Sequence, residues 1–133
     1  MPESNFQVGK NDIILHFRRD DYLESGSELP FSYYKDILQS KQFDKIYITG
    51  DIDEAVKDAF ACYLPNIVEL PPIDTLQFMK QFDNIVIANS TFSWWGAYLS
   101  NASNVWFPIP KKGYWSAEQN QDLYVDGWHK VIL

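Results

Sequence analysis

The feature that most constrains the fold is a regular alternation of short apolar runs with segments of helical spacing. The apolar runs are residues 12–17, 45–49, 67–70, 84–88 and 104–107, and residues 128–133 are a candidate for a closing strand. Within each run the apolar residues follow one another, as in strands that are buried on both faces of a parallel sheet. The pattern predicts one α/β domain, a Rossmann-like doubly wound parallel sheet of about five strands.

The segments between the apolar runs predict the helices. Apolar residues recur at helical spacing in residues 31–39, 50–63, 74–82 and 93–99. Asp74 is the expected N-cap of the third helix, and Cys62, in the second, is expected to be a small buried side chain. Residues 1–11 are polar and predict an N-terminal arm, so the domain is expected to span residues 12–133.

Composition excludes several classes of partner and site. The 133 residues carry 11 basic and 18 acidic side chains, a net charge of −7, which repels nucleic acid and anionic lipid. Cys62 is the single cysteine, which excludes an internal disulfide and a cysteine-cluster metal site. No apolar run approaches the ~18 residues of a membrane span, and residues 1–11 lack the apolar core of a signal peptide. We therefore expect a cytoplasmic protein with no membrane span and no nucleic-acid partner.

Three loops follow predicted strands at their carboxyl ends, where ligands bind in sheets of this kind. The first loop contains His16, Arg18 and Arg19. Because side chains alternate along a strand, His16 and Arg18 should project from one face and Arg19 from the other. The donor fork of an arginine suits a phosphate. The alternative is that both arginines pair with Asp20, Asp21 or other surface acids.

The second loop has the sequence Thr49-Gly50-Asp51-Ile52-Asp53. Gly50 allows the backbone to turn sharply as it leaves the strand. The Asp51 carboxylate could accept both the N1–H and the N2–H groups of guanine, a pairing that adenine cannot offer. The alternative is a helix N-terminus, where Asp51 and Glu54 would form most of a capping box.

The third loop places small hydroxyl residues between a buried strand and a helix. Its sequence is Asn89-Ser90-Thr91-Phe92-Ser93, followed by Trp94-Trp95-Gly96-Ala97. Such a loop leaves main-chain N–H groups free to face an anion, and the helix dipole assists. The alternatives are that Ser93 is a plain N-cap and that the tryptophans pack in the core. No glycine-rich Walker or dinucleotide fingerprint is present, which disfavours an ATPase or a nicotinamide enzyme.

In this order, the three loops resemble the donor-binding half of the alpha-1,2-fucosyltransferase family, glycosyltransferase family eleven. That family shares an H-x-R-R-x-D-Y motif, which resembles residues 16–22 here, and an aspartate-containing strand end, which resembles residues 48–51. It also shares an N-S-T-F-S-W-W-G-A motif, whose nine residues stand unbroken at residues 89–97. The resemblance runs from about residue 14 to residue 128.

The resemblance implies the C-terminal lobe of a two-lobed GT-B enzyme that transfers fucose from GDP-fucose to a carbohydrate acceptor with inversion. It implies no metal and no other cofactor. Carried over by position, Arg18 would contact the diphosphate and Arg19 would support it. Asp51 would read guanine, and the loop of Asn89, Ser90, Thr91, Phe92 and Ser93 would hold phosphate and ribose.

The catalytic residues that the resemblance implies are His16, near the reacting sugar, and Arg18. A base must also deprotonate the acceptor hydroxyl. His16 is one candidate, and a carboxylate from another lobe or substrate-assisted deprotonation are the alternatives. His129 has no motif around it and is expected to be structural.

Two positions depart from the family pattern. Asp20 stands where the family usually has glycine, and Thr49-Gly50-Asp51 stands where it often has Ser-Asp-Asp. In the family a lobe of comparable size precedes the first motif, whereas 15 residues precede His16 here. Three functions stay open: a fucosyltransferase whose acceptor side comes from a partner chain or which uses a small acceptor, a non-catalytic GDP-sugar or nucleotide-binding module, and an interaction subunit that forms homo-oligomers.

Overall fold

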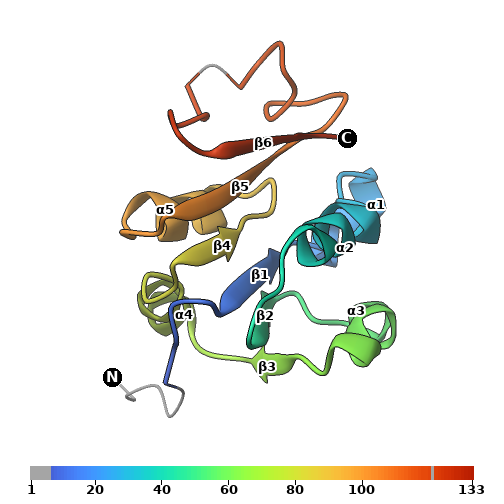
Figure 1. The fold of residues 1–133 in the computed structure, drawn as a ribbon. Coiled ribbons are helices and arrows are strands. Elements are labelled where there is room, and N and C mark those ends of the chain that lie inside the picture. Colours follow the sequence, from blue (N-terminus) through green and yellow to red (C-terminus); the bar gives the residue numbers. More distant parts are fainter. Residues whose placement is uncertain (1–6, 121) are drawn as a thin grey trace.

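The computed structural model describes residues 7–120 and 122–133 and contains a six-stranded parallel sheet (Figure 1). The strands are β1 (Ile13–Phe17), β2 (Ile46–Gly50), β3 (Asn66–Val68), β4 (Asn84–Val86), β5 (Asn104–Ile109) and β6 (His129–Ile132). The helices are α1 (Asp20–Ser25), α2 (Phe31–Ser40), α3 (Glu54–Phe60), the short 3-10 helix η1 (Ala61–Tyr63), α4 (Pro72–Met79) and α5 (Thr91–Tyr98). This architecture confirms the predicted Rossmann-like α/β domain, and the candidate closing strand is the sixth strand of the sheet.

The strand order is β3-β2-β1-β4-β5-β6, and every neighbouring pair is parallel. This is the doubly wound order in which the chain runs outward from the centre in two directions. The order reverses between β1 and β4, so the loops that follow these two strands diverge. A crevice at that point is the usual ligand site of such a sheet.

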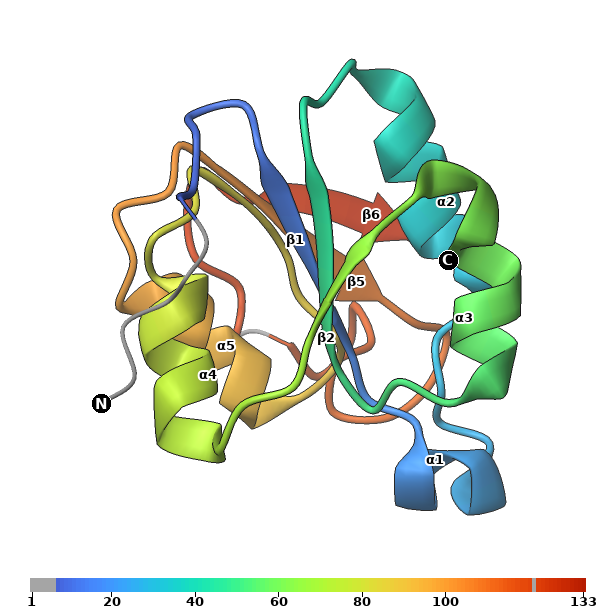
Figure 2. The same cartoon turned by 90° about the horizontal axis from the view of Figure 1, so that it is seen from below.

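Two apolar layers cover the sheet, one on each face (Figure 2). Helices α2 and α3 pack on one face through Tyr33, Tyr34 and Phe60, and α4 and α5 pack on the other through Phe78 and Ala97. Strand β1 lies between them, and Ile13, Ile14 and Leu15 are completely buried. Burial on both faces explains why the central strands are continuously apolar in sequence.

The alternation along β1 agrees with the sequence argument. Ile13, Leu15 and Phe17 face the α2 and α3 side, and Ile14 faces the α4 and α5 side. Tyr34 fixes the end of the strand, because its hydroxyl donates to the main-chain oxygen of His16 at 2.7 Å. The strand therefore delivers His16 and Arg18 at a defined place on the carboxyl edge.

Several local predictions are corrected by the structure. Helix α4 begins at Pro72, and Asp74 lies in its first turn instead of capping it, because a proline is pre-shaped for the first helical positions. Helix α5 begins at Thr91, two residues before the predicted start. Cys62 is exposed in η1 and is not a buried side chain. Helix α1 was not predicted, since none of its residues is buried and no apolar period marks it.

The segment before β1 and the strand β6 form the two ends of the domain. Of the predicted N-terminal arm, residues 1–6 lie outside the described residues. The segment before β1 is held to the domain: the Asn84 amide donates to the oxygens of Lys10 and Asp12, and the Asn11 amide donates to Gln42. Strand β6 confirms the predicted closing strand.

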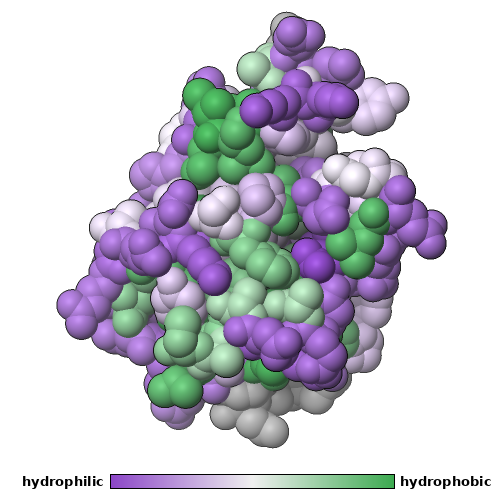
Figure 3. Space-filling model, turned by 90° about the vertical axis from the view of Figure 1, so that its right-hand side faces the viewer, coloured by the Kyte–Doolittle hydropathy of each residue, from purple (hydrophilic) through white to green (hydrophobic). Residues whose placement is uncertain are grey.

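One face of the described residues is mixed in polarity. On the side that carries the C-terminus and α1 to α3, hydrophobic side chains form a band between hydrophilic flanks (Figure 3). Among the described residues, no helix has both the length and the apolar composition to cross a membrane.

Candidate functional site

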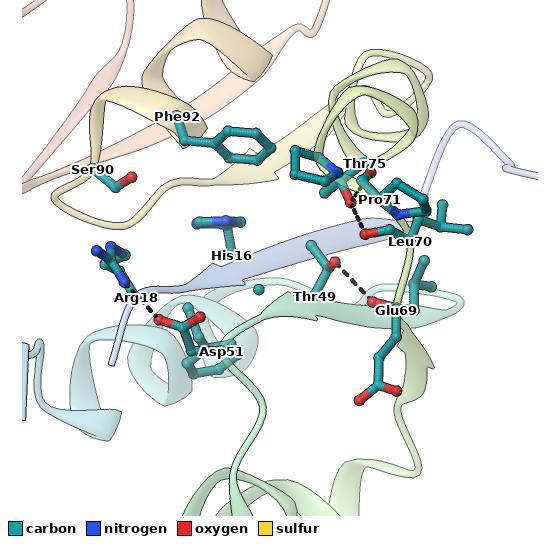
Figure 4. A pocket seen from close by; sticks show the side chains of 14 residues that line it. His16, Arg18, Thr49, Asp51, Glu69, Leu70, Pro71, Thr75, Ser90 and Phe92 are labelled. Carbon is teal, nitrogen blue, oxygen red and sulfur yellow. Dashed lines mark hydrogen bonds and ion pairs between the residues drawn. The ribbon is translucent and has the colours of Figure 1, made fainter. Parts of the chain in front are cut away.

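A cavity of about 730 Å³ opens at the carboxyl edge of the sheet. It lies beyond the ends of β1, β2 and β3 and is closed on one side by the loop between β4 and α5 (Figure 4). Its polar wall is formed by His16, Arg18, Thr49, Asp51 and Ser90, and its apolar wall by Leu70, Pro71 and Phe92. We call this cavity the edge pocket.

His16 lies in the floor of the edge pocket and is 4% exposed. Its ring lies opposite that of Phe92, with 5.5 Å between the ring centroids. Burial lowers the pKa of His16 to about 4, and the nearby Asp51 carboxylate offsets only part of this effect. The imidazole is therefore neutral at pH 7. Its Nδ1 atom is buried and has no hydrogen-bond partner among the described residues.

Arg18 is held in the edge pocket by two carboxylates. Its Nη2 lies 2.7 Å from Asp21, and its Nη1 donates to Asp51 at 3.1 Å. The Asp21 side chain is 68% exposed and the Asp51 side chain 21%, so the bond to Asp21 is the more easily broken. An arginine held in this way presents a fixed positive charge that can exchange an exposed carboxylate for another anion.

Asp51 joins the loop after β2 to the loop after β1. Its Oδ2 accepts hydrogen bonds from the main-chain N–H groups of Arg19 and Asp20, at 2.7 and 3.1 Å, and from Arg18. Burial alone would raise the pKa of Asp51, but these bonds and the guanidinium charge outweigh burial and lower it. The sequence offered helix capping as an alternative role for Asp51. In the structure Asp53 caps α3 instead, because its side chain accepts a hydrogen bond from the Val56 main-chain N–H at 3.0 Å.

Replacing Asp51 with asparagine should destabilise the protein by about 1–3 kcal/mol, because the amide cannot carry the charge that the three donors bind. The matched control is Asp21→Asn, which removes an exposed partner of the same arginine and should cost less than about 1 kcal/mol. Urea denaturation of both variants measures the difference. Equal losses would show that Asp51 does not hold the two loops together.

Arg19 lies on the other face of the chain, as strand alternation predicts. Its Nε donates to Asp53 at 2.9 Å, and its guanidinium lies 4.8 Å from the centroid of the Phe31 ring. Arg19 does not line the edge pocket. Its side chain fixes the backbone that presents Arg18.

The loop between β4 and α5 divides its residues between two cavities. Ser90 and Phe92 line the edge pocket, whereas Asn89 and Thr91 line a second cavity on the other side of the loop. Ser93 lines neither, because it is completely buried and its Oγ bonds to Ala88 and Ser90. Ser93 therefore holds the shape of the loop that the four other residues use.

Sequence reasoning did not find the outer wall of the edge pocket. That wall is formed by the end of β3 and the start of α4, where the Thr75 hydroxyl donates to the oxygens of Leu70 and Pro71 at 3.0 and 3.1 Å. The Glu69 side chain points away from the other labelled residues (Figure 4). The Pro71-Pro72 pair was the available signal, but it indicates a chain break more directly than a ligand wall.

Comparison with known proteins identifies the family. The family model described as glycosyl transferase family 11 matches residues 51–131, more than half of the chain. The chain belongs to glycosyl transferase family 11. This confirms the family that the three loops resemble. The matched segment contains the whole of the third loop and, of the second, Asp51, Ile52 and Asp53.

A curated relative of this family 11 protein is the O-antigen biosynthesis glycosyltransferase WbnK of Escherichia coli. It is 30% identical over 135 residues, and the alignment covers 89% of this chain and 44% of the relative. The chain thus spans less than half the length of that protein. No solved structure matches the chain.

Proposed function

We propose that this domain binds the nucleotide-sugar donor of a glycosyl transfer, and that the donor is GDP-fucose. The observation that carries the proposal is Arg18, a partly exposed cation inside a cavity at the carboxyl edge of the sheet. An edge site of this kind is where doubly wound sheets bind nucleotides. The net charge of −7 makes a single built-in cation the natural anchor for an anionic ligand. The fucose follows from the family resemblance of the loops.

The proposed reaction needs charge stabilisation at the leaving group. The acceptor oxygen attacks the anomeric carbon, the bond from that carbon to the diphosphate oxygen breaks, and the electron pair leaves with GDP. Attack from the face opposite to GDP inverts the anomeric centre. In this scheme Arg18 stabilises the growing charge on the diphosphate, and no metal or further cofactor is proposed.

The acceptor proton needs a base, and His16 is a weak one. The pKa of its imidazole is about 4, well below the pKa range in which a general base works best near neutral pH. We propose that His16 forms a hydrogen bond with the nucleotide sugar, either as acceptor or as donor, while its imidazole ring stays neutral. The proton then passes to a carboxylate outside the edge pocket or to the departing diphosphate.

Asp51 is proposed to contribute to guanine recognition through one oxygen. Its Oδ2 accepts hydrogen bonds from three donors, which leaves Oδ1 as the oxygen that guanine would contact. One oxygen offers guanine a single bond, so the expected preference for GDP over ADP is modest.

Arg18→Ala should weaken GDP binding by about 10- to 100-fold, the range expected for loss of a hydrogen bond to a charged group. Calorimetry with GDP, ADP and UDP on the wild type and the variant makes the measurement. Lys57→Ala, on α3 and outside the edge pocket, is the matched control and should bind GDP as the wild type does. Equal affinity for the three nucleotides, or unchanged binding by Arg18→Ala, would contradict the proposed function.

A further inference from the structure

The second cavity encloses about 570 Å³ and is bounded by three separate parts of the chain. Tyr22 and Ser27 come from α1 and the segment after it, Asn89 and Thr91 from the loop between β4 and α5, and the rest from the segment between β5 and β6. That last group contains Lys112, Tyr114, Trp115, Gln119, Asp122 and Leu123. We call this cavity the loop pocket.

The chemistry of the loop pocket differs from that of the edge pocket. Its polar groups are mainly amides and hydroxyls, and its two charged side chains, Lys112 and Asp122, have opposite signs. A lining with no net charge does not select an anion. It suits a neutral ligand with many hydroxyl groups, because amides and hydroxyls can both donate and accept hydrogen bonds.

Asn89 supplies the most specific polar group. Its Nδ2 donates to the main-chain oxygen of Ser27 at 2.9 Å, which fixes the orientation of the amide. Its Oδ1 is buried and has no hydrogen-bond partner among the described residues, and the residue is 8% exposed. A buried acceptor without a partner costs free energy. Because Asn89 lines the loop pocket, a ligand hydroxyl that displaces the groups covering Oδ1 and donates to it would recover that cost.

Aromatic rings supply apolar surface for a ligand ring. Tyr114 is 79% exposed and lines the loop pocket, so its ring is available to a ligand there. The next residue, Trp115, is buried, and the centroid of its ring lies 4.9 Å from that of the Phe107 ring. Aromatic faces next to fixed hydrogen-bonding groups are typical of sites for small organic ligands.

The loop pocket and the edge pocket share a wall. The Arg18 guanidinium lies 4.7 Å from the centroid of the Tyr22 ring, and the Tyr22 hydroxyl donates to the main-chain oxygen of Asn89 at 3.0 Å. A ligand in the loop pocket would therefore lie across one tyrosine ring from the cation of the edge pocket.

We propose that the loop pocket binds a pyranose ring of the carbohydrate acceptor. The proposal rests on the proposed function, which requires a sugar hydroxyl near the diphosphate of the donor. Tyr114 contacts the apolar face of the ring, and Asn89 accepts a hydrogen bond from one of its hydroxyls. The acceptor thus contacts the domain that binds the donor, whatever other surface it also meets.

Saturation-transfer NMR with methyl glycosides of galactose, glucose, mannose and N-acetylglucosamine tests the proposal, with and without GDP. At least one glycoside should receive saturation from the protein, and Tyr114→Ala should weaken its binding by about fivefold. Tyr98→Ala, which removes an exposed aromatic side chain from α5 outside the loop pocket, should not. Both variants should bind GDP within about twofold of the wild type, since neither residue lines the edge pocket.

The outcomes separate this inference from the proposed function. If GDP binds but no glycoside does, or if Tyr114→Ala and Tyr98→Ala bind glycosides equally, the loop pocket is not a pyranose site. A parallel sample contains GDP-fucose in place of GDP. If its fucose receives saturation that Tyr114→Ala removes, and no free glycoside receives any, the cavity belongs to the donor and the inference is overturned. If the wild type does not bind GDP, the proposed function is overturned. The glycoside measurements without GDP would then still show whether the loop pocket binds a pyranose.

Discussion

Gly50→Ala is expected to destabilise the protein by more than about 3 kcal/mol, the cost of severe backbone strain combined with a main-chain overlap. Gly50 ends β2 with a φ of +98°, where a residue with a side chain is strained. A Cβ atom there would overlap the main-chain oxygen of Phe17 and approach Nε2 of His16 to 3.1 Å. The substitution therefore pushes β1 and β2 apart at the edge pocket.

Gly26→Ala is the matched control for this prediction. Gly26 also has a positive φ, +72°, but no atom lies within 4 Å of the position its Cβ would take. Its cost should be about 1 kcal/mol, since only the left-handed backbone is penalised. The difference between the unfolding free energies of the two variants, measured by urea denaturation, gives the cost of the Cβ overlap apart from the cost of the left-handed backbone. Similar losses for Gly50→Ala and Gly26→Ala would show that β1 and β2 are not closely apposed at Gly50.

The free energy of unfolding should fall by about 3 kcal/mol between pH 7 and pH 4 because of His16 alone. Burial lowers the pKa of His16 to about 4 in the folded protein, from the ordinary histidine value of 6.5. As the pH falls below 6.5, His16 binds a proton in the unfolded chain but stays unprotonated in the folded protein until the pH approaches 4. The stability that His16 provides is complete above pH 6.5 and is lost as the pH falls to about 4.

His16→Gln tests this assignment because glutamine does not titrate. Urea denaturation at several pH values between 7 and 4 should give a shallower dependence for the variant than for the wild type, with the difference confined to this range. Carboxylates such as Asp51, whose pKa is lowered, act mainly at lower pH and are common to both proteins. Parallel curves for the two proteins would contradict a neutral buried His16.

The strands were the most predictable part of the fold. Ile13, Ile14 and Leu15 are buried between two helical layers, and this environment requires the continuous apolar run that the sequence displays. Helix α1 gave no such signal, because none of its residues is buried. The N-terminus of α4 was misplaced because Asp74 is a good capping residue by type, whereas the preceding prolines determine where the helix begins.

The candidate site was predictable only where it depends on local geometry. Alternation along β1 is a local property, and it correctly separates Arg18 from Arg19. The bonds from Asp51 to the amides of Arg19 and Asp20 join residues more than 30 positions apart, and no spacing rule encodes them. The loop pocket was not predicted for the same reason, since it combines three segments that are distant in sequence.

The division of the loop between β4 and α5 has a consequence for how the two cavities communicate. Ser90 and Phe92 on one side, and Asn89 and Thr91 on the other, are consecutive residues on one short backbone. A ligand that displaced this backbone from one side would also reshape the cavity on the other side. Thermodynamic linkage makes such an effect reciprocal: if the first ligand changes the affinity for the second by some factor, the second changes the affinity for the first by the same factor. Two separate cavities would in this way behave as one cooperative unit.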